Sequence, residues 1–280
     1  MNLRIAALLT SFFGFFVMVG TPAYASKSVT YTFGVVPQFD ARHTHRVWRP
    51  LLTELEQRTG LKFRLVGSSS IPNFESQFLA GEFDFAYMNP YHVLKASMSQ
   101  SYVPLVRDIG RSLYGVVVVR KDSPIRDMKE LANKLVAFPS PNALGASLIP
   151  RADLKYIYGV SVEPLYVQSH SSVYLNVAMG KVDAGGGVQK TFDQQPRSVR
   201  DKLQVIYETR RSAPHPIAAH SNVSPAVRLS VQQALLALGK TAKGRDLLQL
   251  IPIKQIGVAS MEDYRPLGEW GLQEFYKSKD

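Results

Sequence analysis

Strands and helices alternate along the sequence, and this order limits the possible fold more than any other feature. Short apolar runs at 29–36, 62–66 and 83–87 are typical of buried strands. Between the first two, the segment 47–58 spaces its leucines as a helix does, and Gly60 stands where glycine commonly ends a helix. Strands that are joined by helices form parallel sheets with helices on their faces. The sequence therefore predicts an α/β fold.

The same alternation continues through the rest of the chain. Further strands are expected at 102–106, 114–119, 135–138, 162–167, 182–185, 203–207 and 216–219. Further helices are expected at 73–80, 123–131, 171–179, 225–238, 243–250 and 263–276, and another begins at Pro90. One more helix ends at Tyr158, and Pro150 either starts it or kinks it.

One short pattern occurs twice, at 80–86 (AGEFDFA) and at 179–185 (MGKVDAG). In each copy a helix ends, a glycine can adopt the left-handed cap, and the next strand carries an aspartate. Any joint between a helix and a strand can look like this. Because the copies are about 100 residues apart in two successive units, we expect two similar lobes, each a mostly parallel sheet flanked by helices.

The first residues have the pattern of a secretory signal peptide. Arg4 precedes an apolar run at 5–20, and Ala23 and Ala25 provide the small residues of a cleavage site before Ser26. A membrane anchor is the alternative, but a helix that spans a bilayer needs roughly 20 apolar residues. We therefore expect cleavage after Ala25 and a periplasmic protein.

Composition excludes several classes of site. The chain has no cysteine, which removes disulfides and thiolate metal sites, and its six histidines form no helical metal-binding pair. The net charge of +11 favours an anionic partner, such as a small oxyanion, a membrane surface or a nucleic acid. The basic residues are scattered and not interleaved with aromatic ones, so we expect no nucleic acid. No nucleophile motif, metal site or cofactor motif is found, and we expect no enzyme.

Three segments carry a resemblance to a known family: 81–91 (GEFDFAYMNPY), 114–125 (YGVVVVRKDSPI) and 169–184 (SHSSVYLNVAMGKVDA). They are similar to the phosphate, phosphite and phosphonate-binding proteins of ABC importers, and the resemblance covers nearly the whole mature chain. It implies the type II periplasmic-binding fold, with a ligand cleft between two lobes and chain crossovers near 110–120 and 210–220. The expected division is a signal peptide at 1–25, lobe 1 at 26–113, lobe 2 at 114–216, and a return strand with C-terminal helices on lobe 1 at 217–280.

On lobe 1, the resemblance implies an aromatic wall for the ligand. Tyr87, Asn89 and Tyr91 follow a buried strand, and Phe39 and Trp48 follow the first strand. Open α/β sheets bind ligands at the carboxyl ends of their strands. Two alternatives remain open at this point: Trp48 shares the leucine face of its helix and would then be core, and Asn89 would cap the next helix.

On lobe 2, the family places hydroxyl side chains before a helix whose N-terminus faces the ligand. Backbone N–H groups and the helix dipole attract an anion there. This chain has Asn142, Ala143, Leu144, Gly145 and Ser147 in that segment, so most of the hydroxyls are missing. We therefore expect an anion with a carbon body and weak binding of inorganic phosphate.

Two further residues match ligand or strand positions of the family, His170 and Asp183. His170 lies just before a helix and would contact the ligand, although a lone histidine is also common as a structural residue. Asp183 serves either as a ligand contact or as a hydrogen-bond acceptor of the scaffold.

These observations predict a monomeric periplasmic protein that closes on a small organic anion and delivers it to an ABC permease. The alternative is a periplasmic sensor with the same fold, whose closed form docks on a membrane signalling protein. An enzyme on this fold is a third possibility, against which the export signal and the missing nucleophile argue.

Overall fold

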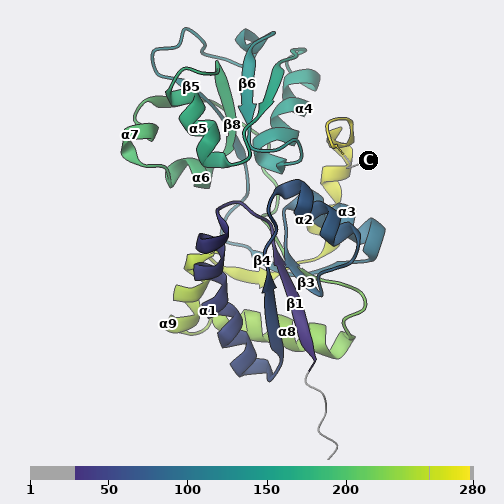
Figure 1. Ribbon diagram of the computed structural model, residues 1–280. Helices are drawn as coiled ribbons and strands as arrows, with labels where there is room; N and C mark the ends of the chain where they lie inside the picture. The colour runs from purple at the N-terminus through teal and green to yellow at the C-terminus, as the bar shows by residue number, and fades with distance from the viewer. Residues whose placement is uncertain (1–28, 252, 278–280) are drawn as a thin grey trace, which may run out of the picture.

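A computed structural model describes residues 29–251 and 253–277 and contains two β-sheets, each flanked by helices (Figure 1). The first sheet has the order β11-β4-β10-β3-β1-β2 and the second the order β7-β6-β8-β5-β9. The strands of the first sheet are β1 (Thr30–Val35), β2 (Lys62–Val66), β3 (Phe85–Tyr87), β4 (Val103–Asp108), β10 (Ile217–Ala219) and β11 (Ile256–Val258). Those of the second are β5 (Gly115–Arg120), β6 (Leu135–Phe138), β7 (Glu163–Tyr166), β8 (Ala184–Val188) and β9 (Leu203–Glu208).

Most strands of each sheet point in one direction. Strand β1 pairs in parallel with β2 and β3, and β10 lies antiparallel between β3 and β4, so β1 to β4 share one direction. In the second sheet β6 pairs in parallel with β7 and β8, while β5 runs antiparallel between β8 and β9. The predicted α/β class with mostly parallel strands is confirmed.

Helices cover the first sheet on both sides. Helix α1 (Ala41–Thr59) packs with α8 (Pro225–Leu238) and α9 (Ala242–Leu250), whereas α2 (Ile71–Leu79) and α3 (Pro90–Gln100) pack together on the other side (Figure 1). Side chains fix where these helices begin. The carboxylate or hydroxyl oxygens of Asp40 and Ser70 accept the N–H groups three residues on, at 2.8 and 3.2 Å.

The second sheet is flanked by α4 (Ile149–Tyr156), α5 (His170–Ala178), α6 (Gln189–Asp193) and α7 (Arg197–Arg200). Each face of this sheet has its own core, because successive side chains of a strand point to opposite sides. Val116 and Val118 pack in one cluster with Tyr174, and Val117 and Val119 pack in the other.

The repeated sequence pattern forms the same joint in both lobes. Gly81 and Gly180 adopt left-handed φ values of 71° and 68°. The Oδ2 atom of Asp84 then accepts the backbone N–H of Thr32 at 2.7 Å, and the Oδ2 atom of Asp183 accepts that of Leu135 at 3.0 Å. Each aspartate therefore fixes the start of the neighbouring strand.

Two predicted helices differ from the structure, and one short strand was not predicted. The helix expected at 263–276 is a series of short 3₁₀ turns at Met261–Asp263, Arg265–Glu269 and Leu272–Glu274. Pro266 and Gly271, which has φ +71°, interrupt the α-helical hydrogen bonding there. The helix expected at 123–131 is reduced to one 3₁₀ turn at Lys129–Leu131, and strand β11 was not predicted.

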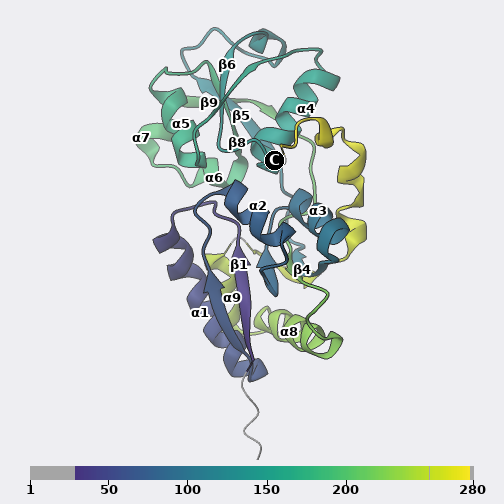
Figure 2. The same ribbon diagram turned by 45° about the vertical axis from the view of Figure 1, so that its right-hand side comes forward.

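The C-terminal segment 265–277 contacts α3, which flanks the first sheet, and α4, which flanks the second (Figure 2). The Tyr276 ring lies 5.6 Å from that of Tyr91 on α3. On the other side, Arg151 of α4 donates from Nη2 to the carbonyl oxygen of Phe275 at 3.0 Å, and Lys155 pairs with Glu274. This segment therefore bridges the two lobes.

The lobe boundaries at residues 113 and 216 remain our proposal for how the chain divides. Residues 1–25, the predicted signal peptide, lie outside the described part of the chain. Within the ranges 29–251 and 253–277, no helix has the length and apolar character of a membrane span.

Candidate functional site

Two short segments connect the sheets, 109–114 between β4 and β5 and 209–216 between β9 and β10. They pair with each other through Leu113 and Ser212, whose backbone N–H groups each donate to the other's carbonyl oxygen at 2.9 Å. Their positions agree with the crossovers expected near 110–120 and 210–220. The cleft between the lobes lies beside this pair of segments.

The helix start predicted to hold an anion begins with a π-helical turn at Leu144–Leu148, which continues into α4. This turn lies directly on the second sheet. A Cβ atom at Gly115 would lie 1.7 Å from the Gly145 carbonyl oxygen, and one at Gly186 would lie 2.0 Å from that of Ala146. Glycine at 115 and 186 is therefore what lets the turn approach the sheet so closely.

Leu144, Gly145 and Ala146 of this turn line a cavity of only about 20 Å³. Its walls are mainly apolar, and its described lining residues are Val36, Gln38, Ile71, Asn89, Leu113, Ala143, Leu144, Gly145, Ala146, His170, Val188 and His215. A cavity needs roughly 10–15 Å³ to hold one water molecule. In this arrangement of the lobes, the space at the helix start is therefore close to that of one water molecule.

A much larger cavity, of about 430 Å³, adjoins this small one and shares Gln38, Leu113, Val188 and His215 with it. It lies between the first residues of α1, helix α6 and the two connecting segments. Three cationic side chains line it, Arg111, Lys190 and Arg211, and Asp193 is the single carboxylate among its described lining residues. Aromatic rings line it as well, those of Phe39, Tyr87 and Tyr114.

The cations of this cavity are held in place by their neighbours. Asp108 accepts Arg111 Nε at 2.6 Å and also accepts three backbone N–H groups at 2.7 to 3.0 Å, which fixes the carboxylate. The Arg211 guanidinium lies 3.9 Å from the centre of the Tyr114 ring. Burial and, to a smaller extent, the positive charge of Arg111 together lower the pKa of Lys190 to about 8. A bound anion would relieve this repulsion.

His215 and Tyr87 form a neutral wall of the same cavity. Their rings stack at 5.2 Å, and the Gln38 amide lies 3.1 Å from His215 Nε2. Burial lowers the pKa of His215 to about 3, with smaller contributions from His92 and His170. The imidazole is therefore neutral at pH 7, and the amide N–H donates to it.

His170 lines the small cavity beside the helix start, and its Nδ1 lies 3.4 Å from the Thr191 hydroxyl oxygen. Burial lowers its pKa to about 4. A neutral imidazole can still donate an N–H to an anion, and the charge of the ligand would strengthen that bond.

The predicted aromatic wall of lobe 1 is partly assembled. Phe39 and Tyr87 line the large cavity. Trp48 is 3% exposed and packs between the rings of Phe33 and Tyr87, because it lies on the leucine face of α1. Asn89 caps α3 by accepting His92 N–H at 2.8 Å, and it also lines the small cavity.

Trp48 and four further predicted residues lie outside both cavities. Tyr91 packs on Tyr276, and the Ser147 side chain is fully buried in the turn. Asn142 uses its amide to donate to Glu75 Oε2 and to the Lys277 carbonyl oxygen, both at 2.8 Å, which leaves it no donor for a ligand. Asp183 is exposed just before β8. Its role is the contact described above with the backbone N–H of Leu135, the first residue of β6.

The sequence interpretation missed the three cations of the large cavity. Arg111 and Arg211 lie in the two connecting segments, and Lys190 follows β8. They are far apart in the sequence and form no motif. The one available signal was the presence of arginines inside both expected crossovers, which the fold brings together.

Comparisons with known proteins agree with this fold. Residues 33–264 match the family model described as "ABC transporter, phosphonate, periplasmic substrate-binding protein". The chain is 24% identical over 220 residues to the phosphate-import protein PhnD of Mycolicibacterium smegmatis, covering 71% of this chain and 68% of that protein. It is 23% identical to the phosphonates-binding periplasmic protein of Escherichia coli, covering 92% and 85%.

A solved structure of PhnD1 from Prochlorococcus marinus in complex with methylphosphonate has the same fold, with a TM-score of 0.78, 16% identity and coverage of 88% and 98%. The resemblance read from the sequence is thereby confirmed, and so are the two-lobed fold and the role in solute transport, whereas the sensor alternative is not favoured. The chain belongs to the family of periplasmic substrate-binding proteins of phosphonate ABC transporters.

Proposed function

We propose that this protein captures an organic anion in the 430 Å³ cavity, with the charged group held by Lys190, Arg111 and Arg211. The observation that carries this proposal is the contrast between the two cavities. The helix start, where the resemblance implies an oxyanion, is lined by apolar side chains and leaves about 20 Å³. The adjoining cavity has both the volume and the positive charge.

The apolar side chains at the helix start make a bare phosphate unfavourable. Leu144 is 3% exposed and Ala143 is 6% exposed, so methyl groups stand where hydroxyl donors would be needed. Each oxyanion oxygen left without its hydrogen bond costs roughly 1–3 kcal/mol. Inorganic phosphate should therefore bind weakly, even though the backbone N–H groups of the turn remain.

The large cavity suits an anion with a carbon body. Its volume of about 430 Å³ falls within the range of small-molecule sites, which is roughly 300–1,000 Å³. Phe39 and Tyr114 give it apolar surface, while Lys190 and Arg111 lie near each other and can share one charged group. A phosphonate or sulfonate with a ring or chain of several carbons matches this combination.

Calorimetric titration tests the proposal with inorganic phosphate, methylphosphonate and phenylphosphonate. We expect phenylphosphonate to bind at least about tenfold more tightly than phosphate, and Lys190→Gln to weaken it by about tenfold or more. Lys181→Gln is the matched control, because Lys181 is exposed and lines neither cavity. Tight phosphate binding that Lys190→Gln leaves unchanged would contradict the proposal.

We also propose that the protein is exported, that its signal peptide is cleaved after Ala25, and that it is a monomer. Its lobes close on the ligand, and this closed form binds the permease. The two short connecting segments support closure by hinge motion. N-terminal sequencing of the periplasmic form should begin at Ser26. Small-angle scattering should show a monomer whose radius of gyration falls when phenylphosphonate is added, and an unchanged radius at saturation would contradict hinge closure. An intact chain in the membrane fraction, or a dimer, would count against these points.

A further inference from the structure

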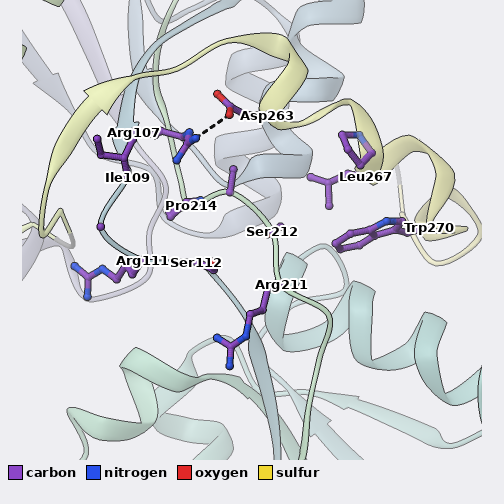
Figure 3. A pocket seen from close by; sticks show the side chains of 13 residues that line it. Arg107, Ile109, Arg111, Ser112, Arg211, Ser212, Pro214, Asp263, Leu267 and Trp270 are labelled. Carbon is purple, nitrogen blue, oxygen red and sulfur yellow. Dashed lines mark hydrogen bonds and ion pairs between the residues drawn. The ribbon is translucent and has the colours of Figure 1, made fainter.

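A third cavity, of about 500 Å³, lies against the connecting segments and the C-terminal segment (Figure 3). Arg111, Ser112, Arg211 and Pro214 line both this cavity and the ligand cleft, so the connecting segments form the wall between them. Its other walls come from the end of β4 and from the turns at 263–270. We call it the hinge cavity.

The hinge cavity is rich in arginine. Arg107, Arg111 and Arg211 line it, against one carboxylate among the described lining residues, Asp263. Asp263 pairs with Arg107 at 2.8 Å, and Figure 3 shows this pair at one end of the cavity. Arg211 pairs with Glu208 at 3.1 Å, but both side chains are half exposed, and such surface pairs contribute little. Asp108, behind the lining, pairs with Arg111 at 2.6 Å, so Arg211 with its half-exposed partner is the arginine most open to a ligand.

Two buried donors near this charge lack partners. The Nε atom of Arg107 and the hydroxyl of Ser212 are both buried and have no hydrogen-bond partner among the described residues. Buried polar groups in folded proteins almost always have one. Both donors belong to residues that line the hinge cavity, and each side chain would have to turn for its donor to reach a ligand oxygen there.

The remaining surface of the hinge cavity is apolar. Pro214 and Leu267 line it, and the indole of Trp270 projects into it from the C-terminal segment (Figure 3). Trp270 is held there by Arg210, whose guanidinium lies 4.5 Å from the ring centre and pairs with Asp153 at 2.8 Å. The arginines at one end of the cavity can bind an anionic group, and the indole at the other end can pack against a ring. The cavity therefore suits a ring that bears an anionic group.

We propose that the hinge cavity is a second ligand site, which takes a small aromatic or otherwise apolar anion, either a carboxylate or a phosphate ester. Such a ligand contacts both connecting segments and the C-terminal bridge at once. Because the lobes can move only if these segments move relative to one another, its binding favours one lobe arrangement and so changes the affinity of the cleft.

The experiment uses Trp270 as its reporter. The chain has two tryptophans, so Trp48→Phe leaves Trp270 alone in the background of every variant. Phenyl phosphate is titrated as the test ligand. Two control ligands are titrated in the same way: inorganic phosphate, which has the charge but no ring, and benzyl alcohol, which has the ring but no charge. We expect a saturable change in Trp270 fluorescence with phenyl phosphate, and a much smaller response to either control.

Two variants separate the hinge cavity from the cleft. Arg107→Met alters only the hinge cavity and should weaken phenyl phosphate binding, read from the fluorescence, at least about tenfold, whereas Lys190→Met alters only the cleft and should keep a saturable response. Should Arg107→Met fail to fold, Ser212→Leu fills the hinge cavity and must abolish the same response. The proposal is overturned if the fluorescence response is lost in Lys190→Met but kept in Ser212→Leu. It is also overturned if the Trp48→Phe protein without further changes shows no response.

Discussion

Replacing Leu144 by serine should convert the helix start into a phosphate site at a cost in stability. Leu144 is almost fully buried beside the first N–H groups of the turn and fills the space that an oxyanion would need. Truncating a buried leucine costs about 2.7–5.0 kcal/mol of unfolding free energy, depending on how far the site collapses. A serine hydroxyl leaves a similar void and is buried without a ligand to bond, so we expect the ligand-free variant to lose at least about 3–5 kcal/mol.

Urea unfolding with and without phosphate measures both parts of this prediction. A ligand at 100 times its Kd adds about 2.7 kcal/mol to the stability of the folded state, so phosphate should restore much of what Leu144→Ser loses. Wild-type protein should respond far less. Leu131→Ser, a fully buried leucine of the second lobe that lines neither cleft cavity, is the control that should lose stability without recovering it. An equal response to phosphate in wild type and Leu144→Ser would refute the reasoning.

Three further predictions concern the polar groups of the cleft and its surroundings. Asn142→Ala removes the bonds to Glu75 and to the Lys277 backbone, and should lower the unfolding free energy by about 2–4 kcal/mol in urea. His170 and His215 stay neutral when folded and protonate when unfolded, so stability should fall as pH drops from about 6.5 toward 4, and no acid-induced loss in this range would contradict their burial. Anion affinity, measured by calorimetry, should fall as pH rises through about 8, where free Lys190 loses its proton, and a flat profile would remove Lys190 from the site.

The main elements of the fold were predictable because their signals are local. Apolar runs mark the strands, and the twin aspartates Asp84 and Asp183 mark equivalent joints in the two lobes. The segment after Asp263 was not predictable from its apolar spacing, because Pro266 and Gly271 break it into 3₁₀ turns that are held by contacts with both lobes. Strand β11 has three residues and forms only by pairing with β4.

The site was less predictable than the fold because it is assembled from distant segments. The general rule for open sheets placed Phe39 near the cleft, and the family resemblance placed Tyr87 and His170 there. Arg111 and Arg211 are about 100 residues apart and become neighbours only through the paired connecting segments. The size of each cavity depends on side-chain packing around Leu144, which no sequence pattern reports.

A crystal structure of the complex with phenylphosphonate tests the central claim most directly. The claim predicts the phosphorus atom beside Lys190 and Arg111 in the 430 Å³ cavity, with the phenyl ring against Phe39 or Tyr114 and Leu144 still filling the helix start. Phosphonate oxygens that instead accept the N–H groups of Leu144, Gly145 and Ala146, with Lys190 left in solvent, would contradict it.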